Sequence, residues 1–222
     1  MIVNKSSNKG LKSRIYDELK SKIMFCELLP GTLLVESEIC KEYGVSRMPV
    51  REALLNLEKE GYVVINPRSS TKVSLISLRE IKDIVEARCL IEKNILSTLS
   101  GSLPEDIIQT LQSLCGRFEE LSEANGDGTS RVKMFLQLDY QFHSTLISLC
   151  TNNFLRSFAL DLINRSVRYW YLMVANDEKR LIDAMREHKV ITDAFIEGDF
   201  ERVTKNVESH IKAFYNQMYI VD

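Results

Sequence analysis

The stretch ESEICKEYGVSRMPVREALLNLEKEGY, residues 36–62, predicts two short helices joined by a glycine turn. The first helix should end at Tyr43. The second should begin near Ser46, a residue type favoured at helix N-termini, and run to about Glu60. Gly44 lies in the turn, where the backbone needs a residue that tolerates positive φ. This arrangement is typical of a helix-turn-helix.

The start of the second helix carries the residues that such a motif presents to DNA. The shared core would be small and apolar, with the residues Ile39, Cys40, Val45, Val50 and Ala53. In this geometry the second helix enters the major groove, where Arg47 and Arg51 can reach guanine edges or phosphates. Ser46 and Met48 would lie beside them. The alternative is that two helices around a glycine often look alike, and that both arginines are ordinary surface residues.

The flanking segments extend the motif to a winged helix-turn-helix. A leading helix is predicted by apolar residues at helical spacing, Leu11, Ile15, Leu19 and Ile23. Two strands follow the motif, YVVIN at 62–66 and TKVSLI at 71–76, joined by PRSS. Arg68 and Lys72 are expected at the tip of this hairpin, where they could touch the DNA backbone or the minor groove.

The composition is that of an ordinary globular protein of 222 residues and 25.5 kDa, with 45% apolar and 27% charged residues. No apolar run is long enough to cross a bilayer, and the first residues lack a signal-peptide core. The five scattered cysteines lack CxxC spacing and suit a reducing cytosol. We therefore expect a cytoplasmic protein without a membrane partner.

The charge divides the chain. Residues 1–78 hold 12 Lys and Arg against nine Asp and Glu, a balance of +3, whereas the remainder carries −5. This asymmetry suggests two domains with different partners, the first tolerating a polyanion.

Helical periodicity continues throughout the second part of the chain. Helices are predicted near 78–99, 104–123, 130–149, 151–175, 177–197 and 199–218. The predicted fold class is therefore mainly α: an N-terminal α/β winged helix-turn-helix, residues 1–77, and an all-α six-helix bundle, residues 78–222.

All three histidines of the chain replace apolar residues on inward helical stripes, and Asp139 lies one turn before His143 on the same face. A buried carboxylate among imidazoles is costly unless it is paired or bound to a metal. The set Asp139, His143, His188 and His210 is thus a candidate N₃O site for one divalent transition metal, Zn, Ni, Mn or Fe. The alternative is that each histidine hydrogen-bonds to backbone or to a hydroxyl group.

Arg88 interrupts the apolar stripe of the helix predicted at 78–99. A desolvated guanidinium needs an anion, and its planar fork suits a carboxylate. Periodicity alone leaves three explanations equal: a carboxylate ligand, an internal salt bridge, or a place in a dimer interface.

The segments PGTLL, YGVSRMPVREAL and LEKEGYV, within residues 28–64, resemble the winged helix-turn-helix of the GntR family of bacterial transcriptional regulators. In that family the residues matching Arg47 and Arg51 contact operator DNA, with the wing tip beside them. Two departures stand out. The wing lacks the glycine that many members carry, and Ser37 replaces an arginine that contacts DNA in some members, which places more of the affinity on Arg47, Arg51 and Arg68.

The segments DYQFHSTL, REHKVITDAFIEGDF and ESHIKAF resemble the FCD domain, the effector-binding half of the FadR subfamily of these regulators, and six helices resemble its VanR-like subgroup. The resemblance implies that Asp139, His143, His188 and His210 are metal ligands. The stretch EARCLIE resembles an FCD stretch whose arginine binds the carboxylate of an organic-acid effector, which favours this role for Arg88.

Together these features predict a homodimeric repressor that binds a palindromic double-stranded operator and responds to a small organic acid near the metal. One rival is a metal-dependent enzyme with a three-His-one-Asp centre. This rival also needs a positioned acid or base, and no further ionisable residue is expected on the inward stripes. In the other rival the metal is purely structural.

Overall fold

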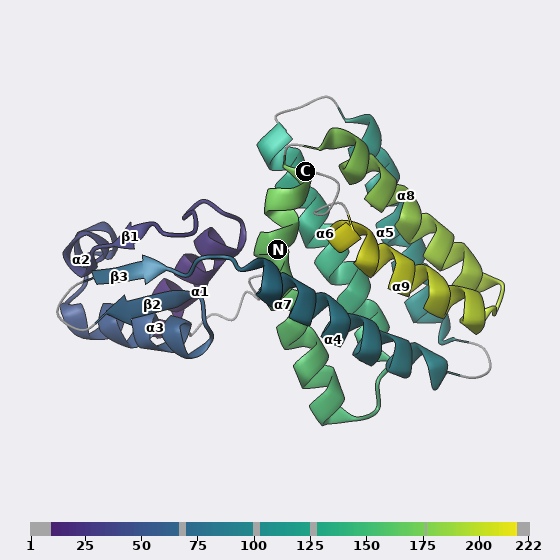
Figure 1. Cartoon of the computed structure of the whole chain (residues 1–222), viewed down its shortest axis with the longest axis horizontal. Helices are drawn as coiled ribbons and strands as arrows, with labels where there is room; N and C mark the ends of the chain where they lie inside the picture. Colours follow the sequence, from purple (N-terminus) through teal and green to yellow (C-terminus); the bar gives the residue numbers. More distant parts are fainter. Residues whose placement is uncertain (1–9, 67–69, 100–102, 125–127, 176, 217–222) are drawn as a thin grey trace. The chain divides into compact units, whose positions relative to one another are not determined.

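A computed structural model describes residues 10–66, 70–99, 103–124, 128–175 and 177–216. The chain divides into two compact units, 1–77 and 78–222 (Figure 1). The predicted fold class is confirmed, because the chain is mainly helical and its N-terminal unit carries a small sheet.

In the N-terminal unit, α1 (Leu11–Met24) and α2 (Glu36–Tyr43) both pack against α3 (Arg47–Lys59). The inward face of α3 is fully buried and consists of Val50, Ala53, Leu54 and Leu57. Gly44 ends α2 with φ of 63°, in the left-handed region that favours glycine. The predicted helix-turn-helix is therefore present.

The wing is part of a three-stranded antiparallel sheet with the order β1-β3-β2. Its strands are β1 (Leu33–Leu34), β2 (Val63–Asn66) and β3 (Ser70–Val73). The sequence did not predict β1, because two residues are too short for a recognisable alternation. Lys72 pairs with Leu33 on one side and Val64 on the other. Its predicted place at the wing tip is therefore wrong, since it lies within the central strand.

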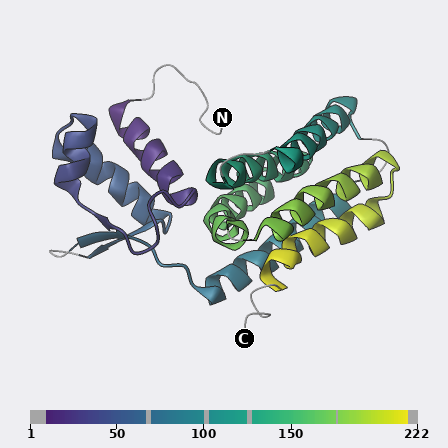
Figure 2. The ribbon, with the colours of Figure 1, turned by 90° about the horizontal axis from the view of Figure 1, so that it is seen from above.

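The described residues of the C-terminal unit form six helices. Their first and last residues lie within two positions of the predicted ones. The predicted end of the last helix, at 218, lies outside the described residues. They are α4 (Leu78–Ser97), α5 (Glu105–Glu123), α6 (Gly128–Ser148), α7 (Asn153–Val174), α8 (Glu178–Ile196) and α9 (Phe200–Asn216). Helix α6 contacts α4, α5, α7 and α8, and α8 and α9 lie side by side (Figure 2).

The inward stripes of these helices form the core. On α5 the buried residues recur at helical spacing, Leu111, Leu114, Cys115 and Phe118.

All five cysteines lie in the described part of the chain and none is in a disulfide, while four of them are buried. Among the described helices, none combines the length and the apolar character that crossing a membrane requires.

Candidate metal centre and nucleic-acid interface

Three helices bring the four predicted ligands together inside the C-terminal unit. Asp139 and His143 lie one turn apart on α6, His188 comes from α8 and His210 from α9. All four are buried, and their candidate ligand atoms lie within 4.8 Å of one another. Oδ1 of Asp139 is 3.8 Å, 3.2 Å and 3.5 Å from the Nε2 atoms of His143, His188 and His210.

The orientation of His188 is set by its own helix. Its Nδ1 lies 2.7 Å from the backbone carbonyl oxygen of Ala184. A carbonyl oxygen can only accept, so Nδ1 carries the proton and donates it. In the neutral ring, Nε2 then presents a lone pair toward the carboxylate oxygen of Asp139, 3.2 Å away. Two acceptors facing each other at this distance leave a position suited to a cation.

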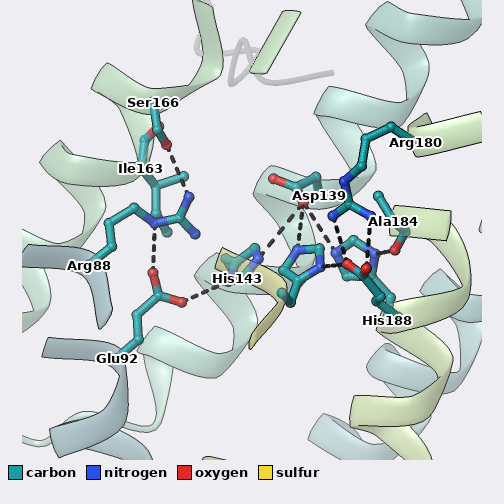
Figure 3. Close-up of polar contacts among 11 residues, drawn as sticks. Arg88, Glu92, Asp139, His143, Ile163, Ser166, Arg180, Ala184 and His188 are labelled. Atoms are coloured by element: carbon teal, nitrogen blue, oxygen red, sulfur yellow. Dashed lines mark hydrogen bonds and ion pairs between the residues drawn. The ribbon is translucent and has the colours of Figure 1, made fainter. Parts of the chain in front are cut away.

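The other two rings are held by carboxylates, and Figure 3 shows the contact of His143 with Glu92. His143 Nδ1 lies 2.7 Å from Oε2 of Glu92, and His210 Nδ1 lies 2.6 Å from Oε2 of Glu187. Ionised carboxylates only accept, so both Nδ1 atoms donate and both Nε2 atoms turn toward Asp139. This is the outer arrangement typical of metal-bound histidines, whose second nitrogen donates to a carboxylate or a carbonyl.

Each of these carboxylates is held in turn by a buried arginine. Arg88 Nε donates to Oε1 of Glu92 at 2.8 Å. Arg180 grips Glu187 with two parallel bonds, Nη1 to Oε1 at 2.7 Å and Nη2 to Oε2 at 2.8 Å. Two hydrogen-bonded series of the form arginine–glutamate–histidine thus converge on Asp139. In each series the arginine holds the glutamate, and the glutamate orients the histidine ring.

The electrostatics of the cluster favour an ionised Asp139 and a neutral His188. Burial alone would raise the pKa of Glu92, but the charges of Arg88 and His143 lower it to about 2. Burial would likewise raise the pKa of Asp139, yet the surrounding histidines hold it well below its usual range. Burial lowers the pKa of His188 to about 4, and the nearby His210 adds to this. At neutral pH the site therefore offers the carboxylate of Asp139 and the neutral imidazole of His188. Burial alone would lower the pKa of His210, but its hydrogen bonds to Asp139 and Glu187 raise that pKa above its ordinary value.

The residues present fit a metal ion. Oδ1 of Asp139 and Nε2 of His143 and His188 are buried without a hydrogen-bond partner in the described part of the chain. Such orphaned atoms are costly unless something binds them. Zn²⁺ ligands at about 2.0–2.1 Å in a tetrahedron lie about 3.3 Å apart. The separations of 3.2 Å, 3.5 Å and 3.8 Å around Asp139 are close to this value, and all four ligand atoms lie within 4.8 Å of one another. The alternative that these are only core hydrogen-bonders accounts for the Nδ1 atoms but not for these inward atoms.

Arg88 is 2% exposed and forms the internal salt bridge that periodicity left open. Besides Glu92 it contacts Oγ of Ser166 at 3.1 Å, and its guanidinium carbon lies 5.8 Å from the centre of the Trp170 ring. Its Nη2 is buried with no hydrogen-bond partner among the described residues. One donor therefore remains for a further acceptor.

Glu92, Arg180 and Glu187 were missed at the sequence level. The expectation that no further ionisable residue shares the inward stripes is wrong, because Glu92 and Arg180 are each 3% exposed. The signal for Glu92 was its position four residues after Arg88, on the same helical face. Glu187 gave no such signal, since it precedes His188 directly and its side chain is one-third exposed.

Four of the six candidate DNA-contacting residues lie at the exposed start of α3. Ser46 is its N-cap residue, without a side-chain cap hydrogen bond, and Met48 is 65% exposed. Arg47 and Arg51 are exposed one turn apart, as a recognition helix requires. Lys72 is exposed on β3. Arg68 lies outside the described residues.

Comparison with known families matches both units. Residues 11–73 match the model described as bacterial regulatory proteins, gntR family, and residues 83–213 match the FCD domain.

Individual proteins agree over most of the chain. YdhC of Bacillus subtilis (strain 168), an uncharacterised HTH-type transcriptional regulator, is 24% identical over 89% of this chain and 86% of its own length. The HTH-type transcriptional repressor RspR of Escherichia coli (strain K12) is 26% identical over 91% and 86%. A GntR transcriptional regulator from Rhodococcus sp. RHA1 shares the fold with a TM-score of 0.78, at 19% identity over 96% of this chain and all of that one.

Proposed function

We propose that a small carboxylate, bound near a divalent metal ion, sets the affinity of this protein for operator DNA. The premise is that the chain belongs to the gntR family of bacterial regulatory proteins and carries an FCD domain, and is therefore a transcriptional regulator. Its family and its relatives are transcriptional regulators and not enzymes. Residues 1–77 would bind DNA, and residues 78–222 would bind metal and effector and form a homodimer.

The observation that carries the metal proposal is the set of three buried ligand atoms without a hydrogen-bond partner in the described residues. Asp139, His143, His188 and His210 would hold the ion. When bound, it supplies positive charge that can attract a carboxylate. The residues of the chain fix the tautomers of the three rings through Glu92, Glu187 and the carbonyl oxygen of Ala184.

The effector proposal rests on Arg88. Its buried guanidinium keeps one nitrogen without a hydrogen-bond partner in the described part of the chain, and a guanidinium favours carboxylate acceptors. Glu92 joins Arg88 to His143, so an acid that binds at Arg88 also acts on a candidate metal ligand. Such an acid must favour one state of the protein to change its DNA affinity.

Repression by release from DNA is the proposed direction, in keeping with a relative named as a repressor. Each protomer would place Arg47 and Arg51 in a major groove. A homodimer would then read two half-sites of a palindrome about one helical turn, or about 34–36 Å, apart.

The first test is elemental analysis of full-length protein purified without chelator or histidine tag. We expect about one divalent ion per chain in the wild type, as for a single four-ligand site. His188→Ala should lose it, while Lys189→Ala should keep it, because Lys189 is the exposed neighbour of His188 on the same helix. Absence of metal in every form would make these histidines core hydrogen-bonders.

A second measurement separates an effector-binding metal from a structural one. Small carboxylates are titrated into metal-loaded and metal-free protein while operator binding is followed. The proposal expects release from DNA in the loaded form alone. An equal response by folded, metal-free protein would assign the ion a purely structural role.

A further inference from the structure

A hollow of about 520 Å³ lies between α8 and α9, the two helices that Figure 2 shows side by side. It is lined by Arg180, Asp183, Arg186, Glu187, Val190, Asn206, Ser209, His210 and Ala213. His210 is the one candidate metal ligand among these residues. The six waters of a hydrated divalent ion occupy about 180 Å³, so the hollow has room for one.

The other two histidines are closed in. His188 is 0% exposed, its ring stacks on Phe118 with 4.3 Å between centroids, and it forms a T-shaped contact with Phe142 with 4.6 Å between centroids. His143 is also 0% exposed, and its partner Glu92 is 3% exposed. Neither ring can turn outward without displacing packed side chains.

His210 is also buried, at 2% exposure, but it differs because it lines the hollow and because its hydrogen-bond partner Glu187 is partly exposed to solvent. Its Nδ1 donates to Glu187, whose side chain is 33% exposed. Both oxygens of Glu187 stay bonded to the buried Arg180. If the His210 ring turns toward the hollow, this carboxylate therefore keeps its place, and the ring returns to the same partner.

We propose that this hollow, the α8–α9 port, is the route by which the divalent ion reaches and leaves the centre, and that His210 is the ligand that binds last and releases first. The inference rests on the proposed metal site. Glu187 is a positioning residue in this scheme, because it acts on the ion through His210. Asp183 and Glu187 line the port and carry negative charge. Arg180 and Arg186 also line it and balance this charge, Arg180 by its contact with Glu187 and Arg186 by a contact of 3.7 Å to Asp183.

Blocking a port should change the rates of metal uptake and release and leave the Kd for the metal unchanged. Damage to the metal site itself would change the Kd. The test fills the hollow of the full-length protein from either helix, with Ser209→Trp on α9 or Val190→Trp on α8, both of which replace exposed residues. Lys205→Trp is the matched control, since it is exposed on α9 and does not line the hollow. Zn²⁺ release to a chromophoric chelator and Zn²⁺ uptake are followed by stopped flow, and Kd by chelator competition.

We expect each filling variant to slow Zn²⁺ uptake and release together, by about tenfold or more, with Kd unchanged within about twofold. Lys205→Trp should match the wild type. Glu187→Gln should accelerate release more than it slows uptake and weaken Zn²⁺ binding by about 10- to 100-fold, as loss of an outer-shell partner does.

Each of the other outcomes counts against the scheme. Unchanged exchange rates in two folded filling variants that bind Zn²⁺ normally would overturn the port and leave the metal site standing. A slower uptake that appears only as a weaker Kd would show damage to the site and also overturn the port. Failure of the wild type to bind Zn²⁺ would overturn the proposed metal site, and the port with it.

Discussion

The two units place the same residue type in opposite environments. Arg47 and Arg51 of the N-terminal unit are exposed at the start of α3, whereas Arg88 and Arg180 of the C-terminal unit are 2% and 3% exposed. An exposed guanidinium keeps its hydration as long as no ligand is bound to it. A buried one needs an anion as soon as the chain folds, and here the anions are Glu92 and Glu187.

The difference separates two ways of building a functional residue. Surface arginines contribute little to folding and can be changed at the expense of binding alone. The buried arginines belong to chains of charge that also orient candidate metal ligands, so their loss affects stability and function together.

The largest expected effect comes from breaking the buried chain at Glu92. Glu92→Ala leaves Arg88 and His143 buried without their shared acceptor, and it should destabilise the C-terminal unit by about 3–5 kcal/mol. Urea unfolding followed by the fluorescence of the single tryptophan, Trp170, reports on this unit. The control Glu86→Ala, exposed on the same helix, should change stability by less than about 0.5 kcal/mol. Equal effects would erase the distinction between buried and exposed charges.

Lowering the pH should also show how far the stability of metal-free protein depends on the ionised carboxylate of Glu92. The pKa of Glu92 lies at about 2 in the folded chain against 4.5 ordinarily. Its stabilisation is therefore present above about pH 4.5 and is lost as the pH falls through about 2. Glu92→Gln should remove a pH-dependent difference on the order of 2 to 3 kcal/mol over this range. Parallel acid-unfolding curves for the two proteins would contradict this account.

On the exposed side, Arg51→Ala should weaken operator binding by about 1–3 kcal/mol, because it removes a contact to a base edge or a phosphate. The free energy of unfolding should stay within about 0.5 kcal/mol of wild type. Lys59→Ala, exposed near the other end of α3, is the control and should bind normally. Operator titrations at fixed salt measure the effect, and unchanged affinity would remove α3 as the recognition helix.

The smallest effect is expected at Lys72, which projects from the central strand of the wing. Lys72→Ala should weaken specific and non-specific DNA binding alike and reduce the salt slope by about 1, since it removes one phosphate contact. A change confined to the specific operator would instead assign Lys72 to base readout.

Local pattern predicted most of the elements. The ends of α4 to α9 agreed within two residues wherever the structure describes them, because helical periodicity and turn residues act over a few positions. The exceptions depended on partners distant in sequence. Strand β1 exists because β3 pairs with it. Lys72 lies in the central strand of the sheet because Leu33 of β1 and Val64 of β2 pair with it from its two sides.

The sequence by itself determined the helix-turn-helix, the helical unit and the four candidate ligands, since a charged or imidazole residue on an apolar stripe is visible in one dimension. Only the tertiary structure decided how those ligands are held. The contact of Glu92 with His143 joins α4 to α6, and that of Glu187 with His210 joins α8 to α9. The sequence separations of these two residue pairs do not predict that they are in contact, because the packing of the whole unit decides which helical faces meet.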